Sequence, residues 1–464
     1  MTLGIPHERV DETTSSPWAI LDDAARRADR HLQSLRDRSV VPTADALDAL
    51  RGFDVPLQET PLPASAVVEE LDRLGSPATV AIPGPRFFGF VDSGALPGAL
   101  AVNWLSTAWE QHGSFEVTSP GSTKIEQVAL RWVLELLGLP SDCAGGFVTG
   151  TTAAAIAILA AARYSVLKRV GWDVDADGLF GAPPITVIVG GEAHSTLFKA
   201  LSVVGLGRNR VVTVPADSQG RLRANLLPKI SGPTIVCAQA GNVNTGAFDP
   251  FLEIADHVRS FDAPAWIHVD GAFGMWARVA PARAHLVAGV ERADSWATDA
   301  HKWLNSPVDC GIAIVRDGDA LRTSLVLKAA YLPSTKANGM DYTLEGSRRA
   351  RGVDVWGALR SLGRSGLSDL VERNCRLAKR FADGFAAAGF RVLNDVVLNQ
   401  VLVEFGDADR TREVISAIQR EGTCWCGGTV WQGRTAMRVS VVSWQTTEDD
   451  VDRSLDAILR IARR

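Results

Sequence analysis

The sequence predicts an α/β fold in which helices cover a mostly parallel β-sheet. Between about residues 76 and 335, short β-rich runs end in Gly, Asn or Asp, and a helical pattern follows each of them. The clearest runs are ITVIVGG (185–191), TIVCAQAG (234–241), AWIHVDGAFG (265–274) and DSWATDAHKW (294–303). Strands that alternate with helices are typical of parallel sheets, which bind ligands beyond the carboxyl ends of their strands. We therefore expect residues 76–335 to form the large domain and to hold the functional site.

Residues 1–75 are expected to form a helical segment that lacks a core of its own. Ser16 and Pro17 are a favourable helix start, because a capping side chain is followed by a proline in the first turn. Apolar residues then recur at helical spacing, at Trp18, Leu21, Ala25, Ala28, Leu32 and Leu35. Since one apolar stripe cannot bury itself, this segment is predicted to pack on the rest of the chain or on a second subunit.

Residues 336–464 predict a small α+β domain. A long helix is indicated by the apolar positions Leu367, Leu370, Leu377, Phe381 and Phe385. Strand-like runs follow, FRVLND, LNQVLVEF and TAMRVSVVSW. Thr447, with Asp450 three residues on, is typical of the cap of a final helix.

Composition and charge exclude several classes of protein. The 464 residues are 46% hydrophobic and 22% charged, as in ordinary globular domains. The net charge of −5 and the lack of a long basic run argue against a nucleic-acid or an anionic-membrane partner. No run reaches the roughly 18–20 apolar residues that span a bilayer, and the polar N-terminus lacks a signal-peptide core. The six cysteines show no zinc-site or redox spacing, so reduced thiols and a cytoplasmic location are expected.

Polar residues follow four of the predicted strands. His194, Asn242, Asp270 and Lys302 each lie just past a β-rich run, and so at one edge of the sheet. A fifth element, GGFVTGTTAAAIAILAAAR (145–163), places a Gly- and Thr-rich turn at the start of a helix. Free N–H groups at such a helix start, together with the helix dipole, bind anions.

An anion site, a buried carboxylate and a recessed lysine together fit pyridoxal 5'-phosphate (PLP). The phosphate is expected at Gly150, Thr151 and Thr152, and the aldehyde on Lys302 as a Schiff base. Asp270 is expected to face the pyridine nitrogen and keep it protonated, so that the ring accepts electrons from the substrate Cα. His194 is expected to stack on the ring face.

Each of these residues also has an ordinary structural interpretation. A lysine after a strand is usually a surface residue, and Asp270, His194 or the 150–152 turn could simply cap a helix. The order of all four features along one sheet favours the cofactor hypothesis. His268 and Asp270 form an H-x-D pair, but no third ligand is evident, so no metal site is expected.

The motifs resemble those of the pyridoxal-dependent decarboxylases that include the aromatic L-amino-acid, histidine and glutamate enzymes. The matching stretches are GFVTGTTAAAIAILAAAR, AHSTLFKA, GNVNTGAFDP, WIHVDGAFGMWA, DAHKWLNSPVDCG, SLRDRSVVP (34–42) and TAMRVSVVSWQTTEDDV. The resemblance implies a fold-type I PLP enzyme with a seven-stranded sheet, and a homodimer whose active site lies at the subunit interface. It also implies that Ala272, Asp299 and His301 join Lys302 in binding the cofactor.

The resemblance further implies conversion of an L-amino acid to its amine and CO₂. Tyr331, in the polar loop 329–342, corresponds to the family's proton donor, supplied by its own or the neighbouring subunit. Arg351 lies in a stretch that the family keeps beside the site, which implies a supporting electrostatic role. An aldehyde synthase, a lyase, an aminotransferase and a silent PLP-binding protein remain alternatives.

Two stretches depart from the family pattern. Asn242 stands where many members carry a threonine near the cofactor, and its amide is still expected to donate a hydrogen bond. In IPGPRFFGFV (82–91), Arg86 could bind an acidic substrate, whereas Phe87 and Phe88 could line an aromatic one. The sequence does not choose between these substrates, and a structural role is favoured for Arg86.

Overall fold

The computed structural model describes residues 16–332 and 335–464, and its contacts divide the chain into two units after Ala81. The first unit contains α1 (Ile20–Ser34), α2 (Ala44–Ala49), η1 (Leu50–Phe53), α3 (Ala64–Gly75) and η2 (Ser76–Ala78). It ends a little beyond the expected residue 75.

Helix α1 carries the apolar stripe that the sequence predicts, but it begins later than expected. Residues 17–19 form a separate turn, with the Ala19 N–H donating to the Ser16 carbonyl at 2.9 Å, so the helix starts at Ile20 and not at Pro17. An ion pair of 2.9 Å between Arg27 and Asp72 joins α1 to α3. No side chain of α1 is buried, and Trp18 just before it is 71% exposed. Leu21 and Leu32 on the apolar stripe are 55% and 39% exposed, so part of this stripe faces solvent, whereas Leu35 just after the helix is buried.

The second unit is built on a seven-stranded sheet, as predicted. In spatial order the strands are β1 (Ala144–Val148), β7 (Gly311–Val315), β6 (Ser295–Asp299), β5 (Ala265–Asp270), β4 (Thr234–Gln239), β2 (Thr186–Gly190) and β3 (Val212–Val214). The five strands from β6 to β3 are parallel, and β7 runs antiparallel to both of its neighbours. Asp270 pairs in register with Gln239 on one side and Ala297 on the other. The carboxyl ends of the central strands therefore meet at one edge.

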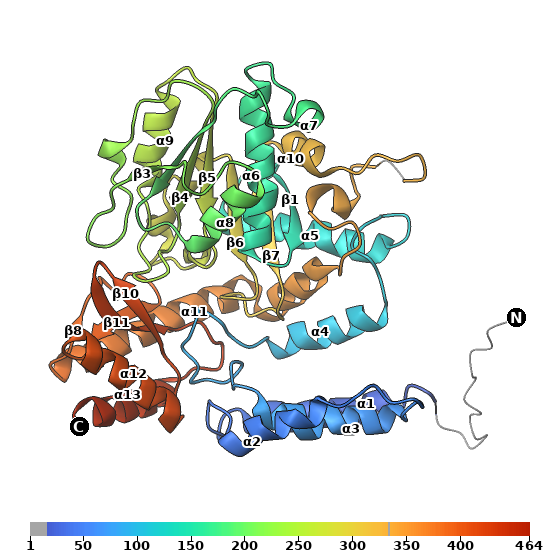
Figure 1. Ribbon diagram of the computed structural model, residues 1–464, viewed down its shortest axis with the longest axis vertical. Coiled ribbons are helices and arrows are strands. Elements are labelled where there is room, and N and C mark those ends of the chain that lie inside the picture. Colours follow the sequence, from blue (N-terminus) through green and yellow to red (C-terminus); the bar gives the residue numbers. More distant parts are fainter. Residues whose placement is uncertain (1–15, 333–334) are drawn as a thin grey trace, which may run out of the picture. The chain divides into compact units, whose positions relative to one another are not determined.

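Helices cover both faces of this sheet, which explains why its strands are apolar throughout. Val187 and Val189 belong to the core shared with α6 (Thr151–Lys168), α8 (Ser195–Val203) and α10 (Gly318–Leu325). Ile188 between them belongs to the opposite core, which is shared with α5 (Pro120–Leu137), α9 (Phe251–Arg259) and the start of α11 (Arg351–Ala387). Figure 1 shows α6 lying along the sheet, with α8 and α10 beside it.

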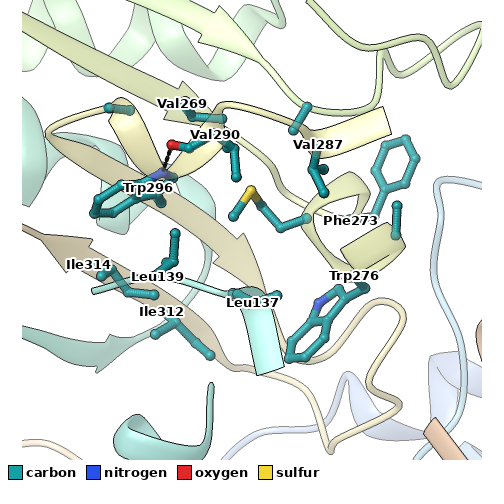
Figure 2. Close-up of a cluster of buried hydrophobic side chains, with 14 of the residues drawn as sticks. Leu137, Leu139, Val269, Phe273, Trp276, Val287, Val290, Trp296, Ile312 and Ile314 are labelled. Atoms are coloured by element: carbon teal, nitrogen blue, oxygen red, sulfur yellow. Dashed lines mark hydrogen bonds between the residues drawn. The ribbon is translucent and has the colours of Figure 1, made fainter. Parts of the chain in front are cut away.

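The core on the α5 side also supports the functional edge of the sheet. Figure 2 shows Trp276, Trp296 and Phe273 packed among aliphatic side chains, and the Trp296 indole donates to the Val290 carbonyl at 2.9 Å. Trp276, in η4 (Gly274–Val279), donates from its indole to the Asp299 carbonyl at 3.2 Å. A fully buried tryptophan thus fixes the end of β6.

A second sheet of four antiparallel strands follows α11. Its order is β10 (Gly427–Trp431), β11 (Arg434–Ser440), β9 (Gln400–Glu404) and β8 (Arg391–Val392). Helix α12 (Ala408–Glu421) packs on this sheet, and α13 (Glu448–Ala462) packs on α11 and α12. Helix α11 is interrupted at Gly363, where φ is 61°, and it contacts α4 (Pro97–Ala108) and α5 as well as β9. The predicted cap of the last helix is present, because Thr447 and Asp450 bond each other's backbone N–H.

Short helices complete the second unit, namely α7 (Val174–Asp177), η3 (Ala224–Leu226), η5 (Ala284–Val287), η6 (Val290–Arg292) and η7 (Gly339–Tyr342). Within residues 16–332 and 335–464, no helix combines the length and the apolar character needed to cross a bilayer.

Candidate active site

A pocket of about 210 Å³ opens at the carboxyl edge of the large sheet. Nine residues that the sequence selects line it, namely Gly150, Thr151, Thr152, His194, Asp270, Ala272, Asp299, His301 and Lys302. They come from the ends of β5 and β6 and from the starts of α6 and α8. The order of the parallel strands thus brings together residues that lie up to about 150 positions apart in the chain.

Lys302 lies on a tight turn just after β6. The Ser93 hydroxyl donates to the Lys302 carbonyl at 2.8 Å, and the Asn305 amide donates to the Trp303 carbonyl at 2.7 Å and to the Val442 carbonyl at 3.0 Å. These bonds fix the backbone, so that only the side chain enters the pocket. Its Nζ lies 3.1 Å from Asp299 Oδ2, which explains how a cation is stabilised at the mouth of the core.

Asp299 also binds the first turn of α6. The Thr151 N–H donates to Asp299 Oδ1 at 2.7 Å, and the Thr151 hydroxyl donates to Oδ2 at 3.1 Å. Gly311, at the start of β7, allows this close packing, because a Cβ there would lie 2.5 Å from the Gly150 backbone. One carboxylate therefore connects the lysine with the start of the helix that is expected to bind phosphate.

Asp270 ends β5 inside the protein. Burial raises the pKa of the Asp270 carboxyl, and electrostatic interactions with His194 and Lys302 oppose this shift. A cation placed in the pocket beside Asp270 would favour its ionised form in the same way.

His194 both caps a helix and lines the pocket, so its two sequence interpretations are compatible. Its Nδ1 accepts from the Thr196 N–H at 3.3 Å and lies 2.8 Å from the Thr196 hydroxyl. Burial lowers the pKa of the imidazole, while the Asp270 charge opposes this. A neutral ring with its hydrogen on Nε2 satisfies both observations.

The donor set of this pocket fits PLP. It combines a primary amine, a carboxylate that a cation would ionise, a flat imidazole and the N-terminus of an eighteen-residue helix. The N-cap of that helix is Gly150, which has no side chain to cap the first turn, so the N–H groups that follow Thr151 are left for an anion while Asp299 accepts the N–H of Thr151.

Several residues selected from the sequence lie elsewhere. Arg86 is 2% exposed, donates to the Thr423 carbonyl at 2.8 Å and pairs with Asp450 at 3.5 Å. Phe87 stacks on Trp425 with ring centroids 5.1 Å apart, and Phe88 packs edge-on against Phe381 at 5.0 Å. These contacts favour the structural interpretation of Arg86, and neither Phe87 nor Phe88 lines the pocket.

Asn242 and Arg351 also point to structural partners. The Asn242 carbonyl oxygen accepts the N–H groups of Asn244 and Thr245, and its amide donates to Glu192 and Gln239. The expected hydrogen bond to the cofactor is therefore not supported, because the turn uses these groups.

The Arg351 Nε donates to Asp309 Oδ1 at 2.9 Å, and the residue does not line the pocket. Tyr331 does not line it either, and its side chain is 85% exposed.

The structure adds pocket residues that the sequence analysis missed. Val91, Thr196, Gln239, Gly241, Val243 and Phe273 also line the cavity. Two charged residues, Asp92 and Arg438, interact electrostatically with its lysine and histidines. Their only sequence signal is their place, directly after FFGFV and inside the strand TAMRVS.

Comparison with known proteins gives consistent matches over most of the chain. The family model described as the pyridoxal-dependent decarboxylase conserved domain matches residues 47–405. Tryptophan decarboxylase 1 of Oryza sativa subsp. japonica is 29% identical over 437 residues, which are 85% of this chain and 84% of the relative. L-2,4-diaminobutyrate decarboxylase of Rhizobium meliloti (strain 1021) is 29% identical over 445 residues, 90% of this chain and 86% of the relative.

Solved structures agree with these matches. The crystal structure of Oryza sativa TDC with PLP and tryptamine superposes with a TM-score of 0.88 at 25% identity. The superposition covers 97% of this chain and 99% of that one.

Proposed function

The chain belongs to the pyridoxal-dependent decarboxylases, and we propose that the pocket at the edge of its large sheet carries out the reaction. The protein is a PLP-dependent carboxy-lyase that converts an L-amino acid to its amine and CO₂. One observation carries the assignment of the site. Lys302, Asp270 and the start of α6 line a single cavity.

We infer the following roles for the pocket residues. Lys302 would hold the aldehyde carbon of PLP covalently, the first turn of α6 would bind the phosphate, and Asp270 would pair with the ring nitrogen. His194, neutral and held by Thr196, would lie on the ring face. When bound, the protonated ring draws electrons away from the substrate Cα.

The charges of the pocket support these roles. Burial alone favours a neutral Asp270, so its ionised form requires a cation in contact with it. A protonated ring nitrogen is such a cation, and the two charges stabilise each other. Asp299 orients the amine of Lys302 and, through Thr151, keeps it aligned with the helix start.

We assign Tyr331 as the donor of the proton that replaces the carboxylate at Cα. None of the described residues that line the pocket is a tyrosine, and Tyr331 is exposed on its loop. We propose that the enzyme is a homodimer in which this loop reaches the pocket of the second subunit. Trp104 on α4 and Trp109 just after it are exposed, as are Leu21 and Leu32 on α1, and a second subunit could bury these apolar side chains.

We also propose a cytoplasmic location. All six cysteines are buried free thiols, which suits a reducing compartment.

Product analysis tests the reaction. Purified enzyme loaded with PLP is incubated with the common L-amino acids, and amine, CO₂, aldehyde, peroxide and keto acid are each measured. Equal yields of amine and CO₂ support the proposal. An aldehyde with peroxide, or a keto acid, would instead identify another PLP reaction. No product from any amino acid would favour a silent PLP-binding protein.

A further inference from the structure

Two opposite charges beside the pocket have no ion-pair partner in the described part of the chain. The Asp92 carboxylate makes no salt bridge or side-chain hydrogen bond within residues 16–332 and 335–464. Arg438 donates from Nη1 to the carbonyl of Val243, a pocket residue, at 3.1 Å, and it too has no carboxylate within ion-pair distance in those residues. Both side chains are only half-buried, so a ligand could reach them.

The backbone around Asp92 is held against the pocket from both sides. Val91 lines the cavity, and the Ser93 hydroxyl binds the carbonyl of Lys302 at 2.8 Å. Phe90 and Val91 have φ values of 50° and 64°, and the left-handed region is costly for a β-branched valine. Packing of Phe90 on Trp425, with centroids 5.3 Å apart, helps to hold this turn. Strain of this kind is retained where surrounding contacts fix a functional geometry.

The surroundings of Asp92 are positively charged. Burial raises the pKa of its carboxyl, and Lys302, His301 and Arg438 oppose this shift, whereas Asp299 adds to it. Asp299 already contacts Lys302 and Thr151, and a cofactor would occupy the amine of Lys302, so the carboxylate of Asp92 would be available to an incoming side chain.

We propose that Asp92 selects amino acids with a positively charged side chain, so that the substrate is a diamino acid. This inference rests on the proposed decarboxylation and names its substrate class. An acidic side chain beside Asp92 would be repelled, and an aromatic one would bury the carboxylate without a partner. An ammonium group satisfies it with a charge-assisted hydrogen bond.

Pairs of amino acids that differ in side-chain charge but are similar in shape test whether Asp92 selects a positively charged side chain. The PLP-loaded enzyme is assayed with 2,4-diaminobutyrate against norvaline and with ornithine against norleucine, which are neutral amino acids of similar shape. Tryptophan and glutamate represent the other classes. Wild type is expected to have a higher kcat/KM for the diamino acids, and Asp92→Asn should lower that preference roughly tenfold to hundredfold. Asp92→Glu should keep the preference, and Asp262→Asn, an exposed carboxylate away from the pocket, should leave it unchanged.

A binding measurement separates this inference from the proposed reaction. Calorimetric titration of the loaded enzyme compares 1,3-diaminopropane with propylamine, without any decarboxylation. Tighter binding of the diamine that is lost in Asp92→Asn supports the role of Asp92. A wild-type enzyme that decarboxylates tryptophan or glutamate better than the diamino acids, or an unchanged diamine preference in Asp92→Asn, overturns the inference and leaves the proposed reaction intact. Selective diamine binding without CO₂ from any amino acid overturns the proposed reaction alone.

Discussion

Lys302 Nζ lies 3.1 Å from Asp299 Oδ2, and the same carboxylate accepts the N–H of Thr151 at 2.7 Å. The residue that would hold the aldehyde of PLP and the helix that would hold its phosphate are therefore joined by one side chain. Asp299→Asn should weaken PLP binding roughly tenfold to hundredfold, because hydrogen bonds to a charged group contribute about 1.5–3 kcal/mol. Titration of the cofactor-free protein with PLP, followed by tryptophan fluorescence, measures this. The exposed Asp262→Asn is the control, and equal affinity in both variants would show that Asp299 does not couple the two ends.

Asp270→Asn removes the negative charge expected at the ring nitrogen while keeping the shape of the side chain. A neutral amide cannot hold that nitrogen protonated, so kcat should fall by roughly a factor of one hundred or more. The covalent link to Lys302 should persist, and the visible absorbance of the loaded protein reports it. Near-normal turnover by this variant would remove Asp270 from the electron-withdrawing role.

Tyr331→Phe tests the proton donor. The variant should bind PLP normally but release less amine, with aldehyde formed in its place or with slower protonation. Because Tyr331 is exposed and outside the pocket of its own chain, we expect it to act on the second subunit.

Mixed dimers check that expectation. A Lys302→Ala subunit paired with a Tyr331→Phe subunit contains one pocket with an intact lysine and an intact tyrosine only if the tyrosine is donated across the interface. Coexpressed subunits with two different affinity tags isolate this species. Recovered amine production supports donation across the dimer, whereas no recovery places the tyrosine in its own subunit.

His268 is expected to make the stability of the fold depend on pH. It lies fully buried on β5 with Nδ1 3.1 Å from the Ser295 hydroxyl, and burial lowers its pKa to about 4. An unfolded histidine titrates near about 6.5, so between these values only the unfolded chain gains the proton. The free energy of unfolding should therefore fall as the pH drops through this window, by about 3.5 kcal/mol for about 2.5 pH units at about 1.4 kcal/mol each.

Urea unfolding from pH 7.5 to pH 4 measures this contribution. His268→Asn should show a correspondingly shallower loss of stability on acidification, since its side chain does not titrate. Parallel curves for the variant and the wild type would contradict the assignment.

The sequence predicts the part of the site that depends on strand order. His194, Asp270 and Lys302 each follow a strand, and parallel pairing necessarily brings such residues to one edge. The pairing of Asp299 with Thr151 follows from the same geometry, because β6 and α6 meet there.

The sequence does not predict contacts made between distant segments. Arg86 donates to a carbonyl 337 residues away in the sequence. Only the folded structure shows that the Arg86 side chain is buried by such contacts and has a structural role. The side chain of Asn242 accepts N–H groups of its own turn, and the presence of asparagine in place of threonine does not predict these hydrogen bonds. Asp92 belongs to no pattern, and its relation to Arg438 exists only once the loop before α4 lies near strand β11.

The central claim is that Lys302 holds the cofactor. Borohydride reduction of the PLP-loaded enzyme makes an imine link permanent, and peptide mapping by mass spectrometry then locates it. We predict one modified peptide, carrying the pyridoxyl group on Lys302, and none in Lys302→Ala. A pyridoxyl group on another lysine, or an unmodified Lys302 in an active preparation, would contradict the account.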